Sequence, residues 1–170
     1  MSSSHEKEQL LTTTIQINSS DIYRTKNIDG LIKYRLKEQL ESVCGKYGYV
    51  VRDSISIVKR SIGKAVTHNE ESKIEYNLTY KMKVILPCTS EIFTCKIDSI
   101  TKMGIIAYMK MENEELNNIE KSPILFIVPQ EYIEDDISLF KKDQTINIEI
   151  VQVRTKYRMK QIQVVGKISK

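Results

Sequence analysis

The chain has 170 residues, of which 41% are hydrophobic and 28% are charged, and its formal net charge is +4. This length holds one large domain or two small ones, and the hydrophobic content suffices for a packed core. The charge balance does not by itself indicate a nucleic-acid-binding protein. No apolar run approaches the roughly 20 residues that a membrane-spanning helix needs, so we expect no membrane segment.

The N-terminal segment MSSSHEKEQ lacks the apolar stretch of a secretory signal, so we expect a flexible polar tail over residues 1–9. The three cysteines are an odd number, and no two of them have the spacing of metal ligands. This pattern is typical of a protein in a reducing compartment.

A strand and a helix are predicted next. Residues 10–17 alternate with a period of two and are rich in β-branched side chains, which indicates a strand. Apolar residues then recur every three or four positions, which predicts a helix over about 29–44; they are Ile28, Ile32, Leu36, Leu40 and Val43. Asn27 or Asp29 can cap its start, and Gly45 stands where a left-handed residue would end it.

The sequence GKYGYV at 45–50 follows the helix and leads into a second alternating segment, DSISIVKR. After the turn-rich segment SIGKAVTHNEES, apolar and polar residues alternate without a break over 74–86. This predicts a long strand with one dry and one wet face. Pro87 cannot continue the ladder, so we place a domain boundary there and assign 1–86 to a small α+β domain of antiparallel strands and one helix.

Residues 87–170 contain five β-type segments and no predicted helix; the segments are EIFTCKIDSI, GIIAYMKM, PILFIVP, TINIEIVQVR and QIQVVGKI. Five short strands with a Greek-key return predict a five-stranded OB-fold β-barrel. The fold class is therefore α+β. This half is electrically neutral, with 12 basic and 12 acidic residues, but its end from Arg154 onward has six basic residues and no acid. Such an end can bind a polyanion locally.

No catalytic motif is visible. The two histidines lack partners at ligand spacing, SIGKAV is not a phosphate-binding loop, and the cysteines are expected to fill core or surface positions. We therefore predict a protein that is not an enzyme and that uses no cofactor and no metal.

Binding is the favoured class, because OB barrels hold single-stranded nucleic acid with basic and aromatic side chains. The candidates are Phe93, Lys96, Lys102, Arg154, Lys156, Tyr157, Arg158 and Lys160. The segment RTKYRMK is expected to be the hairpin between the last two strands. The alternative is that these cations only keep the hairpin tip soluble.

The order of these features resembles the stalk subunit of multisubunit DNA-directed RNA polymerases, which is the seventh subunit of eukaryotic RNA polymerase II and the E subunit in archaea. The resemblance runs from about Leu10 onward. The family's joint matches GKYGY at 45–49, and its long strand and barrel match at further positions. These are Tyr80, Lys81, Pro87, Gly104, Pro123, Arg154 and Gly166.

The chain departs from the family's pattern in several places. The tail before Leu10 has no counterpart, and Ser90 and Ser122 stand where the family has glycine. Related RNA-binding barrels carry aromatic residues on the second and third strands, where this chain has Ile106 and Val128, with Phe93 and Phe126 as candidate substitutes. Base stacking is therefore less supported than contacts to the RNA backbone.

The resemblance implies a docking tip domain over 1–86 and an RNA-binding barrel over 87–170. It implies contacts to the large polymerase core subunits, near the clamp and the RNA exit, from Lys46, Tyr47, Gly48, Ile62, Gly63, Lys64 and Ala65. It further implies nascent RNA and a helical second stalk subunit as partners. The location would be the nucleus for a cellular protein, or the host cytoplasm and the virion for a divergent copy from a large DNA virus.

Two alternatives stay open from the sequence. One is a free-standing single-stranded RNA-binding protein that uses the same barrel. The other is a structural adaptor whose barrel binds only protein, which the neutral charge of residues 87–170 keeps in view.

Overall fold

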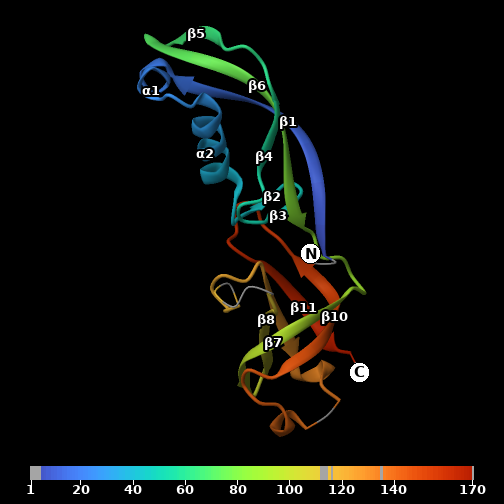
Figure 1. Cartoon of the computed structure of the whole chain (residues 1–170). Helices are drawn as coiled ribbons and strands as arrows, with labels where there is room; N and C mark the ends of the chain where they lie inside the picture. The colour runs from blue at the N-terminus through green and yellow to red at the C-terminus, as the bar shows by residue number, and fades with distance from the viewer. Residues whose placement is uncertain (1–4, 112–114, 116, 135, 170) are drawn as a thin grey trace. The chain divides into compact units, whose positions relative to one another are not determined.

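The computed structural model describes residues 5–111, 115, 117–134 and 136–169, and its fold is α+β with mostly strands and few helices (Figure 1). The chain divides into two compact units, one of residues 1–42 with 50–84 and one of 43–49 with 85–170. The division lies two residues before the predicted boundary at 86. Residues 43–49, called the joint, fall in the second unit. None of the helices in the described ranges is long and apolar enough to cross a bilayer.

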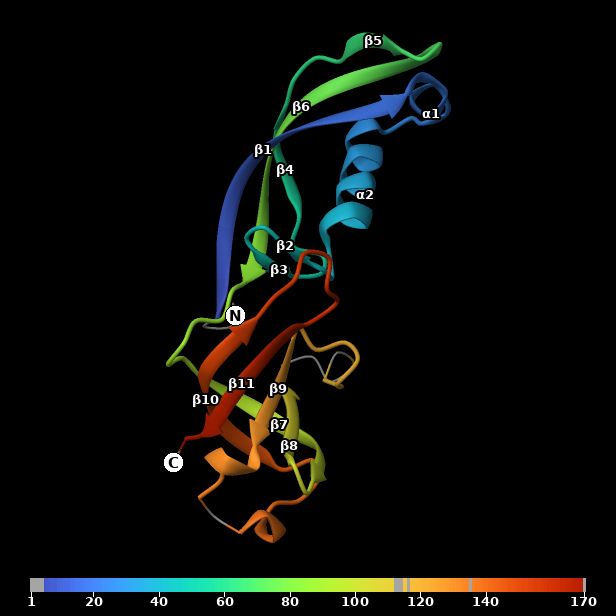
Figure 2. The ribbon, with the colours of Figure 1, turned by 180° about the vertical axis from the view of Figure 1, so that it is seen from behind.

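The first unit is built on one long strand, β6 (Glu71–Ile85). The strand β1 (Glu6–Asn18) runs along one edge of β6, while β5 (Lys64–His68) and β4 (Ser56–Arg60) pair antiparallel with it in succession (Figure 2). On the wet face, side chains of β1 and β6 pair across the strands, for example the Thr14 hydroxyl with Asn77 at 2.9 Å. The predicted alternation of β6 is confirmed, because its dry face is buried from Tyr76 to Val84.

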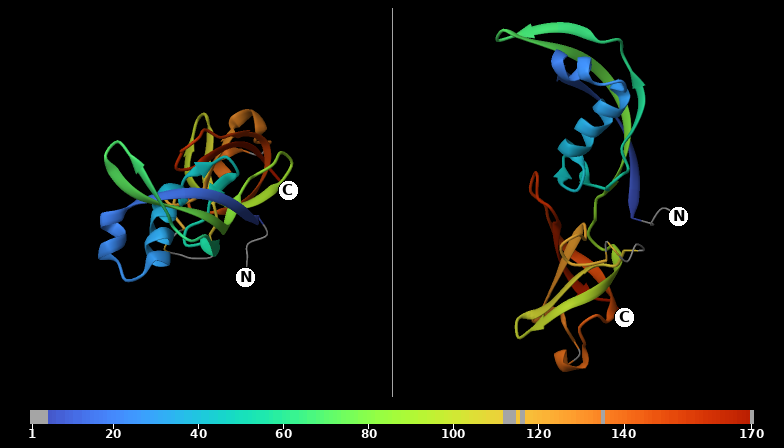
Figure 3. Two further views of the ribbon diagram at one scale, coloured as in Figure 1. Left: turned by 90° about the horizontal axis from the view of Figure 1, so that it is seen from above. Right: turned by 60° about the vertical axis from the view of Figure 1, so that its left-hand side comes forward.

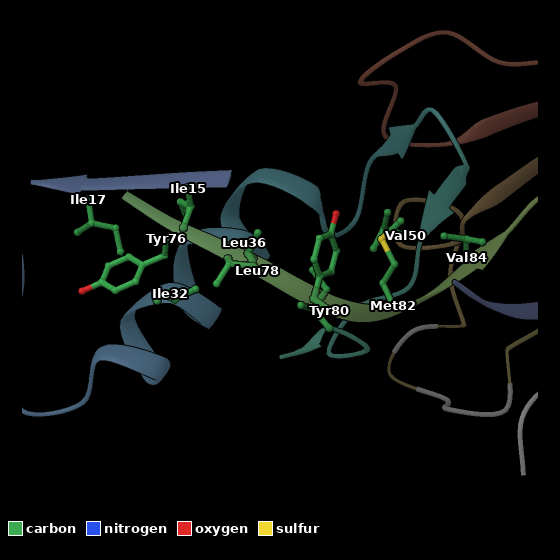
Figure 4. Packing of buried hydrophobic residues seen from close by; sticks show 11 residues of the cluster. Ile15, Ile17, Ile32, Leu36, Val50, Tyr76, Leu78, Tyr80, Met82 and Val84 are labelled. Carbon is green, nitrogen blue, oxygen red and sulfur yellow. The ribbon is translucent and has the colours of Figure 1, made fainter. Parts of the chain in front are cut away.

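The helix α2 (Ile28–Leu40) covers this dry face and buries Ile32 and Leu36 among the side chains of β6 (Figure 4). Asn27 caps its start, because its side-chain oxygen accepts from the Gly30 N–H at 2.9 Å. The helix ends four residues before the predicted position. Ser42, at φ 59°, takes the left-handed conformation that was predicted for Gly45. The segment between β1 and α2 contains the short helix α1 (Ser19–Arg24).

The predicted tail of residues 1–9 is wrong for its second part, because β1 begins at Glu6. Ion pairs fix this part of the strand: Lys83 Nζ lies 3.1 Å from Glu6 and Lys81 Nζ lies 2.9 Å from Glu8. The charged residues that made the segment look like a tail thus pair with the lysines on the wet face of β6. Residues 1–4 lie outside the described residues.

The second unit contains a closed five-stranded barrel, and all five predicted strands are confirmed (Figure 3). They are β7 (Ile92–Thr101), β8 (Gly104–Met109), β9 (Ile124–Pro129), β10 (Thr145–Arg154) and β11 (Ile162–Ile168). The strand order is β10-β11-β9-β8-β7, with β9 and β11 parallel and the other pairs antiparallel. The barrel is therefore OB-fold-like. Two short 3-10 helices, η2 (Gln130–Tyr132) and η3 (Ile137–Leu139), lie between β9 and β10.

Backbone geometry explains two unusual residues of the barrel. Gly104 has φ +141°, and a Cβ there would lie 2.1 Å from the Val128 carbonyl oxygen, so β8 cannot begin with a larger residue. Ser90 has φ 69°, a conformation that favours glycine. Its N–H donates to the Ile150 carbonyl at 2.8 Å, which holds it in place at the entry to β7.

The joint 43–49 is a small hairpin of β2 (Cys44–Gly45) and β3 (Gly48–Val50), in which Gly45 pairs with Gly48. Lys46 and Tyr47 form its two-residue turn. Gly48 has φ +115°, and a Cβ there would lie 2.6 Å from the Ile85 carbonyl oxygen. Gly45 has no such constraint, since its nearest contact would be at 3.9 Å. Only the second glycine of the joint is therefore required by the backbone.

We predict that Gly48→Ala lowers the free energy of unfolding by about 1–3 kcal/mol, because the added Cβ strains the backbone at a positive φ. Gly45→Ala is the matched control from the same hairpin and should change it by less than about 0.5 kcal/mol. Urea denaturation followed by circular dichroism measures both. Equal effects of the two substitutions would contradict the described backbone of the joint.

Candidate nucleic-acid interface

The turn between β10 and β11, residues 155–161, is the most basic exposed segment of the second unit. Lys156, Arg158 and Lys160 are exposed, and Tyr157 is 76% exposed. Arg158 has φ 63°, and its guanidinium carbon lies 5.7 Å from the centre of the Tyr157 ring. Arg154, also exposed, ends β10 and pairs with Gln163 of β11. The turn thus presents cations and one aromatic ring to the solvent.

The joint holds this turn through two backbone hydrogen bonds. The Cys44 N–H donates to the Met159 carbonyl at 2.8 Å, and the Arg158 N–H donates to the Cys44 carbonyl, also at 2.8 Å. Cys44 is buried, and burial raises the pKa of its thiol. The side chain of Gln161 donates to the carbonyl of Ser122 at 2.9 Å and to that of Ile119, which anchors the other side of the turn.

The joint adds a second exposed pair of the same kind. Lys46 is exposed, Tyr47 is 38% exposed, and the Lys46 ammonium lies 5.4 Å from the centre of the Tyr47 ring. Neither 43–49 nor 154–161 contains an acidic residue. Within the described part of the chain, none of the five cations of these two segments takes part in an ion pair. Their charge is therefore available to an anionic ligand.

Two of the predicted RNA-binding lysines lie at the opposite end of the barrel. Lys96 pairs with Thr145 at the start of β10, while Arg154 ends that strand about 30 Å away by strand geometry.

Lys102 lies in the β7–β8 turn, next to Met103. The Met103 carbonyl accepts a hydrogen bond from the Gln130 N–H, beyond the end of β9. Lys96 Nζ also lies 3.4 Å from Asp143. The structure therefore does not bring these two lysines to the basic turn.

Phe93 must be removed from the predicted contacts, because it is 1% exposed and packs in the barrel core 5.6 Å from the ring of Phe126. Val128 and Phe126 are buried as well. The face that points outward from β8, β9 and β11 has an apolar centre, with Ile106 opposite Ile127 and Ile127 opposite Val165.

The next outward residue of β8, Tyr108, is covered. Its hydroxyl donates to the carbonyl of Asn117 in the β8–β9 connection, and the residue is buried. The strands of this face therefore offer no exposed aromatic ring in the described residues.

The predicted docking residues fall into two groups. Lys46, Tyr47 and Gly48 belong to the second unit, whereas residues 62–65 lie at the start of β5 in the first unit. There Ile62 is 93% exposed, and Lys64 and Ala65 are exposed too. Gly63 instead allows close packing within the first unit, because a Cβ there would lie 2.5 Å from Ile74 and 2.8 Å from the Tyr76 ring.

Sequence reasoning missed the role of Met159 and Gln161, and it did not connect the joint with the turn. The bonds of Cys44 use only backbone atoms, so no residue type signals them. The absence of acids from both segments was visible and could have suggested a shared surface.

The described residues contain no group of three or more side chains that could hold a metal ion. No protein-family model matches the chain, and no curated protein matches it either. The resemblance to polymerase stalk subunits therefore stays a prediction.

Two substitutions test which of residues 62–65 stabilise the first unit and which are free to contact a partner. We predict that Gly63→Ala costs about 1–3 kcal/mol of unfolding free energy, because its Cβ overpacks against Ile74 and Tyr76. Ile62→Ala should change it by less than about 0.5 kcal/mol, because the side chain is exposed. Thermal unfolding measures both. A large loss of stability for Ile62→Ala would mean that this side chain packs within its own unit.

Proposed function

We propose that this chain is a non-catalytic stalk subunit of a DNA-directed RNA polymerase, which docks on the core near the clamp and the RNA exit and contacts nascent RNA. The observation that carries the proposal is a closed OB-fold-like barrel whose basic turn has an exposed tyrosine and no acidic partner. The order of the sequence features supports the polymerase assignment. The barrel would be the RNA-binding domain, and the first unit would be the docking tip.

The contact with RNA follows from the chemistry of the turn. Arg154, Lys156, Arg158 and Lys160 approach phosphates as unpaired cations, and their binding releases counterions from the strand. Tyr157 offers a flat ring that any base can stack on. A site of this kind binds single strands without reading their sequence, which suits a subunit that guides every transcript.

Docking would use the exposed part of residues 62–65. Ile62 supplies an apolar side chain that is 93% exposed, and Lys64 supplies a neighbouring charge. An exposed isoleucine beside a lysine suits a contact whose centre is apolar and whose rim is polar. The partners are the large core subunits and a helical second stalk subunit.

Native affinity purification of the tagged chain tests the polymerase assignment. We expect the large polymerase subunits to co-purify, and Ile62→Ala to reduce their recovery because it removes the apolar contact. Lys142→Ala, an exposed residue of the second unit outside the proposed contacts, is the control and should leave recovery unchanged. Purification without any large polymerase subunit would overturn the assignment.

Binding of a labelled oligouridylate tests the RNA contact. We expect Lys156→Ala/Arg158→Ala to weaken binding and to reduce the slope of log affinity against log salt by about 1.4, since each phosphate contact contributes about 0.7 for single strands. Lys141→Ala/Lys142→Ala removes the same charge at the other end of β10 and should leave the slope almost unchanged. Equal effects of the two pairs would show that only net charge matters.

A free-standing single-stranded RNA-binding protein is the second candidate. One observation favours it: the basic turn and the joint that holds it both belong to the second unit, so this surface needs no residue of the first. Binding to RNA without co-purification of polymerase subunits would select this function. Absence of both RNA binding and polymerase co-purification would select the protein-only adaptor, for which the apolar face at Ile127 would be the contact.

A further inference from the structure

We propose that the turn of the joint and the β10–β11 turn form one composite site for single-stranded RNA, in which Tyr47 and Tyr157 each stack on a base. This inference rests on the RNA contact proposed above and extends it to a segment otherwise assigned to docking. It gives Lys46 and Tyr47 a role in ligand binding.

The backbone makes the two turns neighbours. Cys44 bonds to both Arg158 and Met159, and it stands two residues before Lys46 in the same short hairpin. Both bonds measure 2.8 Å, so they hold one turn against the other in the manner of an antiparallel pair. Gly48 closes the joint's hairpin at a positive φ, which keeps Lys46 and Tyr47 in a two-residue turn.

The two turns repeat one chemical arrangement. Each places a tyrosine directly beside a cation in the sequence, with the cation within 6 Å of the ring: Lys46 with Tyr47, and Arg158 with Tyr157. A ring next to a cation can stack on a base while the cation reaches the adjoining phosphate. Both rings are exposed, and the joint raises the cations of the surface from four to five.

The barrel itself offers no competing stacking surface in its described residues. Phe93 and Phe126 are in the core, Tyr108 is covered, and the outward face of β8, β9 and β11 has no exposed aromatic ring in the described residues. One further exposed tyrosine, Tyr132, lies beyond the end of β9 and directly follows Glu131. β11 begins directly after the basic turn, and β9 runs parallel to β11. The end of β9 therefore lies at the other end of the barrel from the basic turn.

Fluorescence anisotropy with the full chain and an oligouridylate of about 16 nucleotides, the upper range for one OB fold, tests the proposal. We expect Tyr47→Leu and Tyr157→Leu each to weaken binding roughly 5- to 100-fold, which is the usual effect of losing one stacked base. Lys46→Ala should reduce the salt slope by about 0.7.

The controls are matched in kind. Tyr132→Leu removes a ring whose exposure, 37%, is close to the 38% of Tyr47, and Lys142→Ala removes one exposed charge. Both should leave the affinity within about twofold of the unaltered chain, because surface substitutions outside a site change energies by less than about 0.5 kcal/mol. Circular dichroism melting of every variant ensures that a loss of binding is not a loss of fold.

The possible results separate the two proposals. If Tyr157→Leu and the double variant of the basic turn weaken binding while Tyr47→Leu and Lys46→Ala do not, the composite site is wrong and the RNA contact stands. If Tyr132→Leu weakens binding as much as Tyr47→Leu, the site does not lie at the two turns. If the unaltered chain does not bind the oligouridylate, both the RNA contact and the composite site are overturned.

Discussion

Two backbone hydrogen bonds at Cys44 are the constraint on which the candidate interface depends. They tie a seven-residue segment near the start of the chain to a turn more than a hundred residues later. A basic turn between two strands would otherwise be held only at its two ends, and its backbone would lose more conformational freedom on binding a ligand. Because the joint and Gln161 anchor the turn from both sides, its cations and tyrosine are presented on an ordered backbone.

The sequence predicted β6 and the five barrel strands, whereas β5 lies in a segment that was predicted to be rich in turns. β6 alternates from Tyr76 to Val84, where its dry face is buried, but Leu86, which the pattern placed on that face, is exposed. The barrel strands were found as runs of β-prone residues that turn residues separate. The end of α2 was placed wrongly, because Ser42 adopts the left-handed conformation that sequence rules reserve for glycine. The start of β1 was missed because its first residues are charged, and two of them form ion pairs with lysines of β6.

The candidate site was only partly predictable. The RTKYRMK segment stood out by its composition, and the structure places it on one exposed turn. Phe93 was predicted to contact RNA as a substitute for the aromatic residues of related RNA-binding barrels, but it faces the core, and its neighbour Ile92 is exposed. Lys96 and Lys102 were grouped with the turn although the register puts them at the other end of the barrel. Register depends on pairing between distant segments, which no local pattern reveals.

The two hydrogen bonds between the joint and the turn join backbone atoms, and this has an evolutionary consequence. Substitutions at positions 46, 47 and 156–158 can change the charge and aromatic content of the surface without touching the hydrogen bonds that shape it. The framework and the ligand-facing residues can therefore diverge at different rates. Related chains could retain the glycine of the hairpin, fixed by the carbonyl of Ile85, while their exposed turns adapt to different partners.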